Sequence, residues 1–220
     1  MKSYRTVAVV PAFNEERRIG KTLRNAKKFV DRVIVVDDGS SDRTSAVSRK
    51  MGAKVIRYEI NQGVGYATRM GLKQAMKLKP DIIIFLDADG QLQPKYIPQF
   101  IEKIKSGYDY VYGFRDLSVY PLERKVGNIG LTVLTNLICP TGIMDTECGY
   151  KALTYKAARK LRLKSKSYEK DIEFAYEAWR NKFKISYVKI KVPIFHPKSA
   201  VLRGFKNFFY LLKLRFSNHN

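Results

Sequence analysis

Short apolar runs alternate with amphipathic segments through the first half of the chain, and this alternation limits the possible folds more than any other feature. The apolar runs favour buried strands, and the segments between them carry apolar residues at helical spacing. We predict strands at residues 6–10, 33–36, 54–58 and 82–86, and helices at 15–30, 41–52 and 65–78. Strands joined by helical crossovers form an α/β fold with a mostly parallel, Rossmann-like sheet and helices on both faces.

The second half alternates less regularly but extends the same pattern. We predict strands at 109–113, 149–154 and 185–192, and helices at 123–138, 171–181 and 201–216. A chain of 220 residues suits one domain with a sizeable core.

Acidic side chains follow two of the predicted strands, although acidic residues are scarce in this chain. Asp87 and Asp89 come directly after the fourth strand, and Asp38 follows the second. Because ligands bind at the carboxyl ends of parallel strands, we expect these carboxylates to gather at that edge of the sheet. With Gln91, Asp87 and Asp89 offer hard oxygen ligands suited to Mg²⁺ or Mn²⁺. A solvated acidic turn is the alternative for this motif taken alone.

Two segments at the same edge suit a nucleotide. The carboxylate of Asp38 can bind a base or ribose, as acidic residues at strand ends do in dinucleotide-binding folds. The segment at 61–65 contains two glycines and precedes a predicted helix, where backbone N–H groups bind phosphates. A capped turn and a flexible loop are the alternatives for these two segments.

The charge of the chain restricts its partners. Lys and Arg number 42 against 20 Asp and Glu, which gives a formal net charge of +22. Such a surface attracts nucleic acid, anionic lipid head groups or phosphorylated substrates. Two cysteines without CxxC spacing argue against a zinc site or a disulfide framework and favour a reduced, cytoplasmic compartment.

Five motifs carry a resemblance to a known family. They are VVPAFNE at 9–15, VVDDGSSD at 35–42, DADGQLQP at 87–94, GFR at 113–115 and DTECGYK at 145–151. Together they resemble the inverting GT-A glycosyltransferases of family 2, and within that family the polyprenyl-phosphate hexosyltransferases. The dolichyl-phosphate mannosyl- and glucosyltransferases belong to this group. The resemblance implies a GT-A catalytic domain over 1–200 and an amphipathic C-terminal helix over 201–220.

On the donor side, the resemblance implies a nucleotide-sugar site and a metal. The pocket would be lined by Pro11, Phe13, Glu15, Val36, Asp38, Asp87, Ala88, Asp89 and Gln91. Lys206, or alternatively Lys198 or Arg203, would close over the donor diphosphate. Mg²⁺ or Mn²⁺ would be held by Asp87, Asp89 and Gln91.

On the acceptor side, Arg115, Arg124 and Asn128 would face a lipid phosphate. This chain has Asn128 where the mannose synthases carry a serine. The implied catalytic residues are Asp89, Arg115, Arg124 and Asp145. Asp145 would act as a base or as a sugar-hydroxyl ligand, and a structural turn is its alternative role.

The reaction implied is transfer of a hexose from GDP-mannose, UDP-glucose or UDP-N-acetylglucosamine to polyprenyl or dolichyl phosphate, with inversion. A phosphate monoester is largely anionic near neutral pH and needs little help from a general base. Paired guanidinium groups would align it.

The predicted C-terminal helix suits a membrane surface. One of its faces is apolar and consists of Val201, Leu202, Phe205, Phe208, Phe209, Leu212 and Phe216, with basic residues beside it. Leu211 and Leu214 on the opposite face leave room for packing on the core or for a membrane subunit. The uncharged stretch at 126–144 contains glycines and a proline, so a membrane span is not expected there. We expect a protein peripheral to the cytoplasmic face of a membrane.

Two other functions would each explain part of the sequence. A transferase of the same fold could extend a glycan or modify another acceptor, but a sugar hydroxyl does not require two arginines. A basic nucleic-acid-binding module would explain the charge, yet phosphates would be repelled by the acidic edge of the sheet. We therefore expect no nucleic-acid partner.

Overall fold

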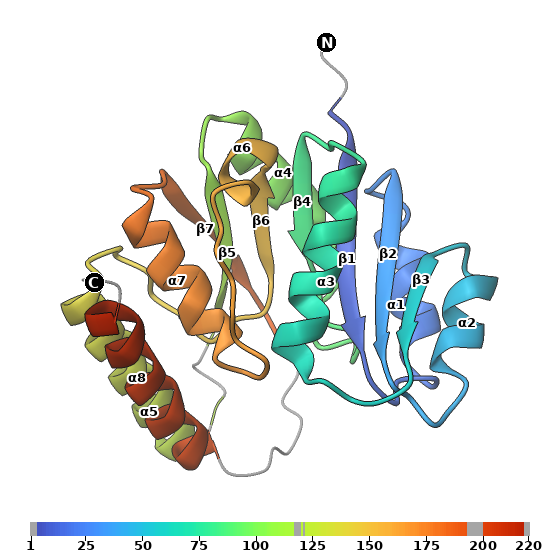
Figure 1. Ribbon diagram of the computed structural model, residues 1–220. Helices are drawn as coiled ribbons and strands as arrows, with labels where there is room; N and C mark the ends of the chain where they lie inside the picture. The colour runs from blue at the N-terminus through green and yellow to red at the C-terminus, as the bar shows by residue number, and fades with distance from the viewer. Residues whose placement is uncertain (1–3, 117–119, 121, 193–199, 218–220) are drawn as a thin grey trace.

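The apolar runs pair into one seven-stranded sheet in the computed structural model, in the order β3-β2-β1-β4-β6-β5-β7 (Figure 1). The strands are β1 Thr6–Ala12, β2 Arg32–Asp38, β3 Lys54–Tyr58, β4 Ile82–Phe85, β5 Tyr110–Arg115, β6 Lys151–Thr154 and β7 Ile185–Ile190. The structure describes residues 4–116, 120, 122–192 and 200–217, and only the backbone at 122–124, 200–205 and 217.

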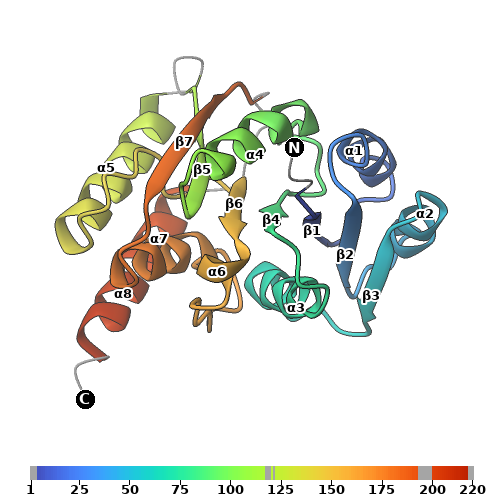
Figure 2. The same cartoon turned by 90° about the horizontal axis from the view of Figure 1, so that it is seen from above.

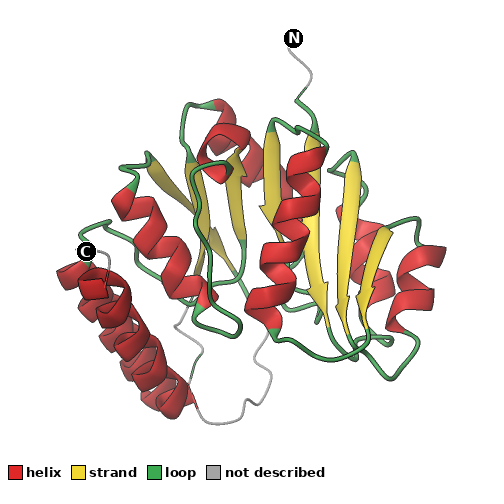
Figure 3. Cartoon of the chain, in the orientation of Figure 1, coloured by secondary structure: helices red, strands yellow, loops and turns green. Residues whose placement is uncertain are grey.

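Helices occupy most of the connections between the strands (Figure 3). They are α1 Ile19–Ala26, α2 Thr44–Lys50, α3 Val64–Lys77, the 3₁₀ helix η1 Pro94–Tyr96, α4 Ile97–Lys105, α5 Leu122–Ile138, α6 Tyr155–Ala158, α7 Lys170–Arg180 and α8 Ala200–Ser217. The mostly parallel α/β sheet is confirmed, because only β6 runs antiparallel to its neighbours β4 and β5.

Alternate residues of the central strands enter two separate cores, one on each face of the sheet. Ala8 and Val10 of β1 pack with α1 and α4, whereas Val7 and Val9 pack with α3, α6 and α7. Figure 2 shows these two helical layers on opposite sides of the sheet. Burial on both faces of the sheet explains why the sequences of these strands are continuously apolar.

Helices α5 and α8 lie side by side beyond α7, at the β7 end of the sheet (Figures 1 and 2). They share a third core with α7, in which Leu211 of α8 is completely buried beside Leu131 of α5. The helix therefore packs on protein through the face that contains Leu211, while Phe209 and Phe216 stay exposed. Two side chains also attach α8 to the body: Asn207 donates to Glu147 at 3.2 Å, and Tyr210 donates to Glu173 at 3.0 Å.

Helices α4 and α6 were not predicted, and α1 begins later than expected. Asn14 has a φ of 55°, a left-handed conformation that a right-handed helix does not contain, so α1 can begin only after it. Asn14 N–H donates to Ser40 Oγ at 2.9 Å and Glu15 N–H donates to Thr44 Oγ1 at 2.8 Å, and these bonds hold the turn in place. In α4, Pro98 stands in the first turn, where the missing N–H group has no cost.

We predict that Gly71→Ala destabilises the fold, because Gly71 is where α3 meets the sheet. A Cβ atom there would lie 2.3 Å from Val9 Cγ1 and 3.2 Å from Val36 Cγ2. The overpacking should lower the free energy of unfolding by about 1–3 kcal/mol in a denaturant titration. Gly130→Ala in α5 is the matched control, since its Cβ meets nothing within 4 Å. The control should stabilise the protein by about 0.5–1 kcal/mol, and equal stability of the two variants would contradict this account.

Candidate active site

A cleft of about 450 Å³ opens where the sheet reverses its strand order, beyond the carboxyl ends of β1 and β4. The chain leaves these adjacent strands in different directions. In open α/β sheets, ligands usually bind in the crevice at such a point. The cleft is lined by Pro11, Ala12, Phe13, Glu15, Asp38, Asn61, Gly63, Val64, Ala67, Asp87, Ala88, Asp89, Glu147, Gly149, Ser167, Tyr168, Lys170 and Asp171.

Asp87 and Asp89 both line the cleft, as the sequence predicted. Burial, followed by the negative charge of Asp87, raises the pKa of Asp89 to about 6. Burial also raises the pKa of Glu15, and the charges of Asp42 and Asp87 add to this effect. Gly149 lets the acidic pair fit, because a Cβ atom at that position would lie 2.4 Å from Asp87 Oδ2. The site thus concentrates negative charge that a cation would relieve.

These carboxylates fit a divalent cation that shares its coordination with a substrate. Within the described ranges, no group of three or more His, Cys, Asp or Glu side chains is arranged to hold a metal ion. Mg²⁺ commonly binds one or two carboxylates together with substrate phosphates, which suits Asp87 and Asp89. Gln91 does not line the cleft, and its backbone N–H donates to Asp89 Oδ1 at 2.9 Å. This backbone bond ties Gln91 to Asp89, and a place for the Gln91 side chain at the cation stays a prediction.

Asp38 anchors the loop at 61–63, which lines one side of the cleft. Its carboxylate accepts hydrogen bonds from Gln62 N–H at 2.9 Å and Gly63 N–H at 2.7 Å. Gly63 has a φ of 97°, and a Cβ atom there would lie 2.3 Å from the carbonyl oxygen of Lys166. Only glycine satisfies both constraints. The predicted approach of this segment to a ligand therefore depends on contacts with a loop a hundred residues away in sequence.

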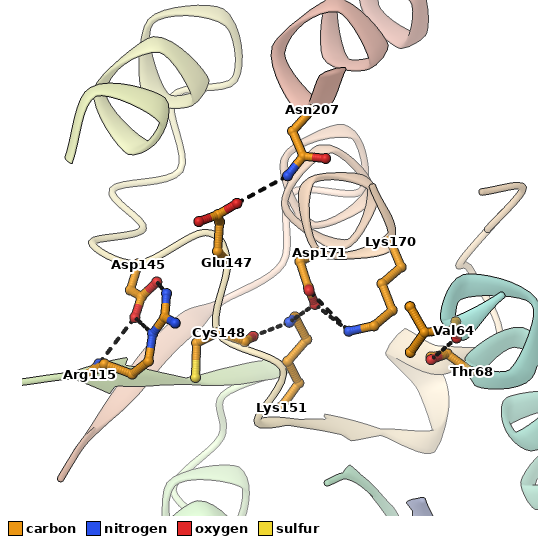
Figure 4. Close-up of polar contacts among 10 residues, drawn as sticks. All are labelled: Val64, Thr68, Arg115, Asp145, Glu147, Cys148, Lys151, Lys170, Asp171 and Asn207. Carbon is orange, nitrogen blue, oxygen red and sulfur yellow. Dashed lines mark hydrogen bonds and ion pairs between the residues drawn. The ribbon is translucent and has the colours of Figure 1, made fainter. Parts of the chain in front are cut away.

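Lys170 and Asp171 also line the cleft, and the sequence analysis did not identify them. They stand in the first turn of α7, and Lys151 of β6 reaches the same carboxylate (Figure 4). One signal was present in the sequence. Asp171 lies at helical spacing from Phe174, Ala175 and Ala178, so a charge falls on the buried face of a predicted helix.

Arg115 and Asp145 form a bidentate ion pair (Figure 4). Arg115 Nε donates to Asp145 Oδ2 at 2.7 Å, and Nη2 donates to Oδ1 at 2.8 Å. The Asp145 side chain is completely buried, whereas that of Arg115 is 19% exposed. Neither residue is among the cleft-lining residues. The geometry suits Asp145 to orienting the guanidinium, not to acting on a sugar as base or hydroxyl ligand.

Three further predicted residues lie outside the cleft lining. Val36 is fully buried in the core against α3 and does not line the cleft. Asn128 is half-buried on α5, and Lys206 is exposed on α8. Three predicted residues lie partly or wholly outside the described part of the structure. The side chains of Arg124 and Arg203 are not described, and neither is any part of Lys198.

A comparison with protein families decides the classification. The family model described as glycosyl transferase family 2 matches residues 7–169. The chain belongs to this family. The glycosyltransferase is 35% identical to the UDP-N-acetylglucosamine–dolichyl-phosphate N-acetylglucosaminyltransferase of Methanococcus voltae, over 94% of each chain. It is 30% identical to the human dolichyl-phosphate β-glucosyltransferase, over 84% of this chain and 65% of the human one.

Solved structures confirm the GT-A fold of this glycosyltransferase. Glucosyl-3-phosphoglycerate synthase from Mycobacterium tuberculosis superimposes with a TM-score of 0.75 over 98% of this chain and 81% of that one, at 19% identity. That enzyme was crystallised with Mn²⁺, UDP and glucosyl-3-phosphoglycerate.

We predict that Mn²⁺ stabilises the glycosyltransferase at pH 7.5 but not at pH 5. The pKa of Asp89 lies near 6 without metal, so protonation stabilises the metal-free fold as the pH falls through that value, whereas the cation needs the ionised carboxylate. At a metal concentration of about 100 Kd, the melting temperature should rise by about 5–10 °C at pH 7.5.

Two variants control this measurement. Asp89→Asn should abolish the Mn²⁺ shift at both pH values, and Asp109→Asn, outside the cleft lining, should retain it. A shift that is equally large at pH 5, or that survives Asp89→Asn, would remove the cation from this site.

Proposed function

We propose that this glycosyltransferase moves a hexose or N-acetylhexosamine from a nucleoside-diphosphate sugar to a polyprenyl or dolichyl phosphate, with inversion and with Mg²⁺ or Mn²⁺. The observation that carries the proposal is the cleft that presents Asp87 and Asp89 beside the loop at 61–63. The names of the relatives, which specify dolichyl phosphate with different sugars, support the acceptor class.

The donor would lie with its nucleoside between the end of β1 and the loop that Asp38 holds. Phe13 is 45% exposed at this side and offers an aromatic surface to a base. Asp87 and Asp89 would hold Mg²⁺ or Mn²⁺ against the diphosphate, and the bound cation would neutralise charge on the leaving nucleotide. Because the Methanococcus voltae relative covers nearly the whole chain, UDP-N-acetylglucosamine is the donor to test first, before UDP-glucose and GDP-mannose.

The acceptor phosphate would meet Arg115, which Asp145 holds in a fixed orientation. A guanidinium that is already oriented loses little entropy when it binds a phosphate. Arg124 and Asn128 on α5 are proposed to complete the phosphate site, and Lys206 to approach the donor diphosphate. The anionic acceptor oxygen would attack the anomeric carbon opposite the leaving group, so no basic side chain is required at the point of attack.

A lipid acceptor also explains the outer surface of α5. Val126, Ile129, Val133 and Leu137 recur at helical spacing, and each is at least half exposed. The inward side of this helix buries Leu131 together with Thr132 and Thr135, so α5 carries apolar side chains on both sides. An exposed apolar stripe of this kind marks an interaction surface. We call these four residues the α5 stripe.

The α5 stripe, extended by Phe209 and Phe216 of α8, is proposed to enter the head-group region of a membrane. Lys213 is exposed on α8 and would contact anionic lipids. No helix in the described portions of the chain is long and apolar enough to span a bilayer. We propose peripheral attachment at the cytoplasmic face, alone or through a membrane subunit that binds the same stripe.

We predict that purified protein with Mn²⁺ transfers sugar to dolichyl phosphate from one of UDP-N-acetylglucosamine, UDP-glucose and GDP-mannose, measured as radiolabelled glycolipid. Asp89→Asn should lower the rate by at least about 100-fold, and Asp109→Asn should match the unmodified protein. Transfer to a free glycan or to 3-phosphoglycerate, with none to dolichyl phosphate, would reject the lipid acceptor. Binding of plain DNA without affinity for any nucleotide-sugar would reject the enzyme proposal.

We predict that Val133→Glu combined with Leu137→Glu weakens binding to anionic phosphatidylglycerol vesicles by more than about tenfold, because two exposed apolar side chains lose their burial in lipid. Cosedimentation measures the effect. Leu78→Glu is the matched control, since Leu78 is 40% exposed at the end of α3, away from the α5 stripe. Unchanged vesicle binding by the double variant would assign the stripe to a protein partner.

A further inference from the structure

Three buried charges are linked to one another at one wall of the cleft, where Lys170 and Asp171 line it and Lys151 lies behind them. Lys151 Nζ donates to Asp171 Oδ1 at 2.5 Å, and Lys170 Nζ donates to Oδ1 at 2.9 Å and to Oδ2 at 3.0 Å (Figure 4). The residues are only 2%, 6% and 7% exposed for Lys151, Lys170 and Asp171. We call these three residues the ion triad.

The position of the ion triad indicates a role in binding a ligand rather than in stabilising the fold. Buried ion pairs generally contribute little stability, since desolvation offsets their attraction and apolar residues can replace them. Two members of the triad, Lys170 and Asp171, line the same cleft as Asp87 and Asp89. A costly charged group at the wall of a ligand cleft is most simply explained by a ligand that it contacts.

The two lysines fix the state and direction of the Asp171 carboxylate. Burial alone would raise the pKa of Asp171, but Lys151 and then Lys170 outweigh burial and lower it. The carboxylate is therefore ionised and accepts hydrogen bonds only. Lys151 is itself immobilised, because it also donates to the carbonyl oxygen of Cys148 and lies over the Phe174 ring at 5.4 Å.

We propose that Asp171 accepts hydrogen bonds from the hydroxyl groups of the donor sugar and thereby selects the sugar, with Lys151 as the positioning residue that holds it. Sugar hydroxyls are donors that match a fixed acceptor in a partly dry cleft. A sugar that lacks the matching hydroxyl would leave the carboxylate unpaired, which is the strongest form of discrimination a binding site offers. The inference rests on the proposed function, since it requires a nucleotide-sugar in this cleft.

With this role, Asp171 does not act as a general base. A carboxylate bound to two ammonium groups is a weak base, and the anionic acceptor proposed above does not need one. The surroundings of Lys170 differ from those of Asp171. Burial lowers the pKa of Lys170, but the negative charges of Asp171 and then Asp87 outweigh burial and raise it. Its ammonium group therefore stays charged between the sugar-binding carboxylate and the acidic pair, where it would face the donor diphosphate.

The test compares two affinities by calorimetry with Mn²⁺ and without any acceptor. UDP and GDP report the nucleotide site, and UDP-N-acetylglucosamine, UDP-glucose and GDP-mannose add the sugar. Asp171→Asn should weaken the preferred nucleotide-sugar by at least about tenfold, the loss expected for a hydrogen bond to a charged group. It should leave the matching nucleoside diphosphate within about twofold. Lys151→Met should give a smaller loss of the same kind.

Controls guard against a purely structural effect. Asp171→Asn leaves two buried ammonium groups without their counter-charge, so the double variant Lys151→Met with Asp171→Asn restores the original net charge of the triad. Glu177→Gln is the matched control on α7, because Glu177 is 3% exposed, pairs with Arg180 and does not line the cleft. It should change neither affinity.

The outcomes are distinguishable. Equal losses for the nucleotide-sugar and the nucleoside diphosphate, in both the single and the double variant, would show a structural role and overturn the inference. An unchanged preference among the three sugars would overturn it as well. If the unmodified protein binds no nucleotide-sugar at all, the proposed function fails together with the inference.

Discussion

Electrostatic repulsion within one cleft is the constraint on which the rest of this structure depends. Asp87 and Asp89 stand together at the end of β4, with Glu15 close enough to raise the pKa of Asp89 further. A part-buried group of like charges is unfavourable by itself and becomes favourable when a cation binds. The fold maintains this arrangement, because Gly149 leaves room for Asp87 and the strand order places β1 beside β4. A glycosyltransferase of family 2 would use that unrelieved charge to bind its donor.

The cleft is assembled from two halves of the chain that meet only in the folded protein. The first half supplies the acidic edge and the loop held by Asp38. The second half supplies the wall made by Lys170 and Asp171, and its loop at 164–168 touches Gly63 and Gly65. Glu173 joins these parts, because it accepts hydrogen bonds from Ser165 and from Tyr210 of α8. The helix proposed to meet the membrane is therefore connected to the donor cleft by hydrogen bonds.

Exposed apolar residues on the outward side of α5 give the outer surface its character. Most surface helices bury their apolar residues, but α5 buries Leu131 and also exposes Val133 and Leu137. The neighbouring α8 contributes Leu211 to the shared core and leaves Phe209 outside. These exposed apolar residues are the surface proposed to meet the lipid tail of the acceptor, and the proposed phosphate site at Arg115 is the one for its head group.

The sequence by itself determined the α/β class, the mostly parallel sheet and the carboxylates Asp38, Asp87 and Asp89 at its edge. It could do so because alternation fixes strand identity, and parallel strands bring their carboxyl ends to one edge whatever the packing details. Only the tertiary structure decided that Asp171 lies in the cleft, that Asp145 orients Arg115, and that α8 packs through Leu211. These contacts join segments far apart in the chain, so they depend on which helix faces the neighbouring elements bury, and local sequence patterns do not contain that information.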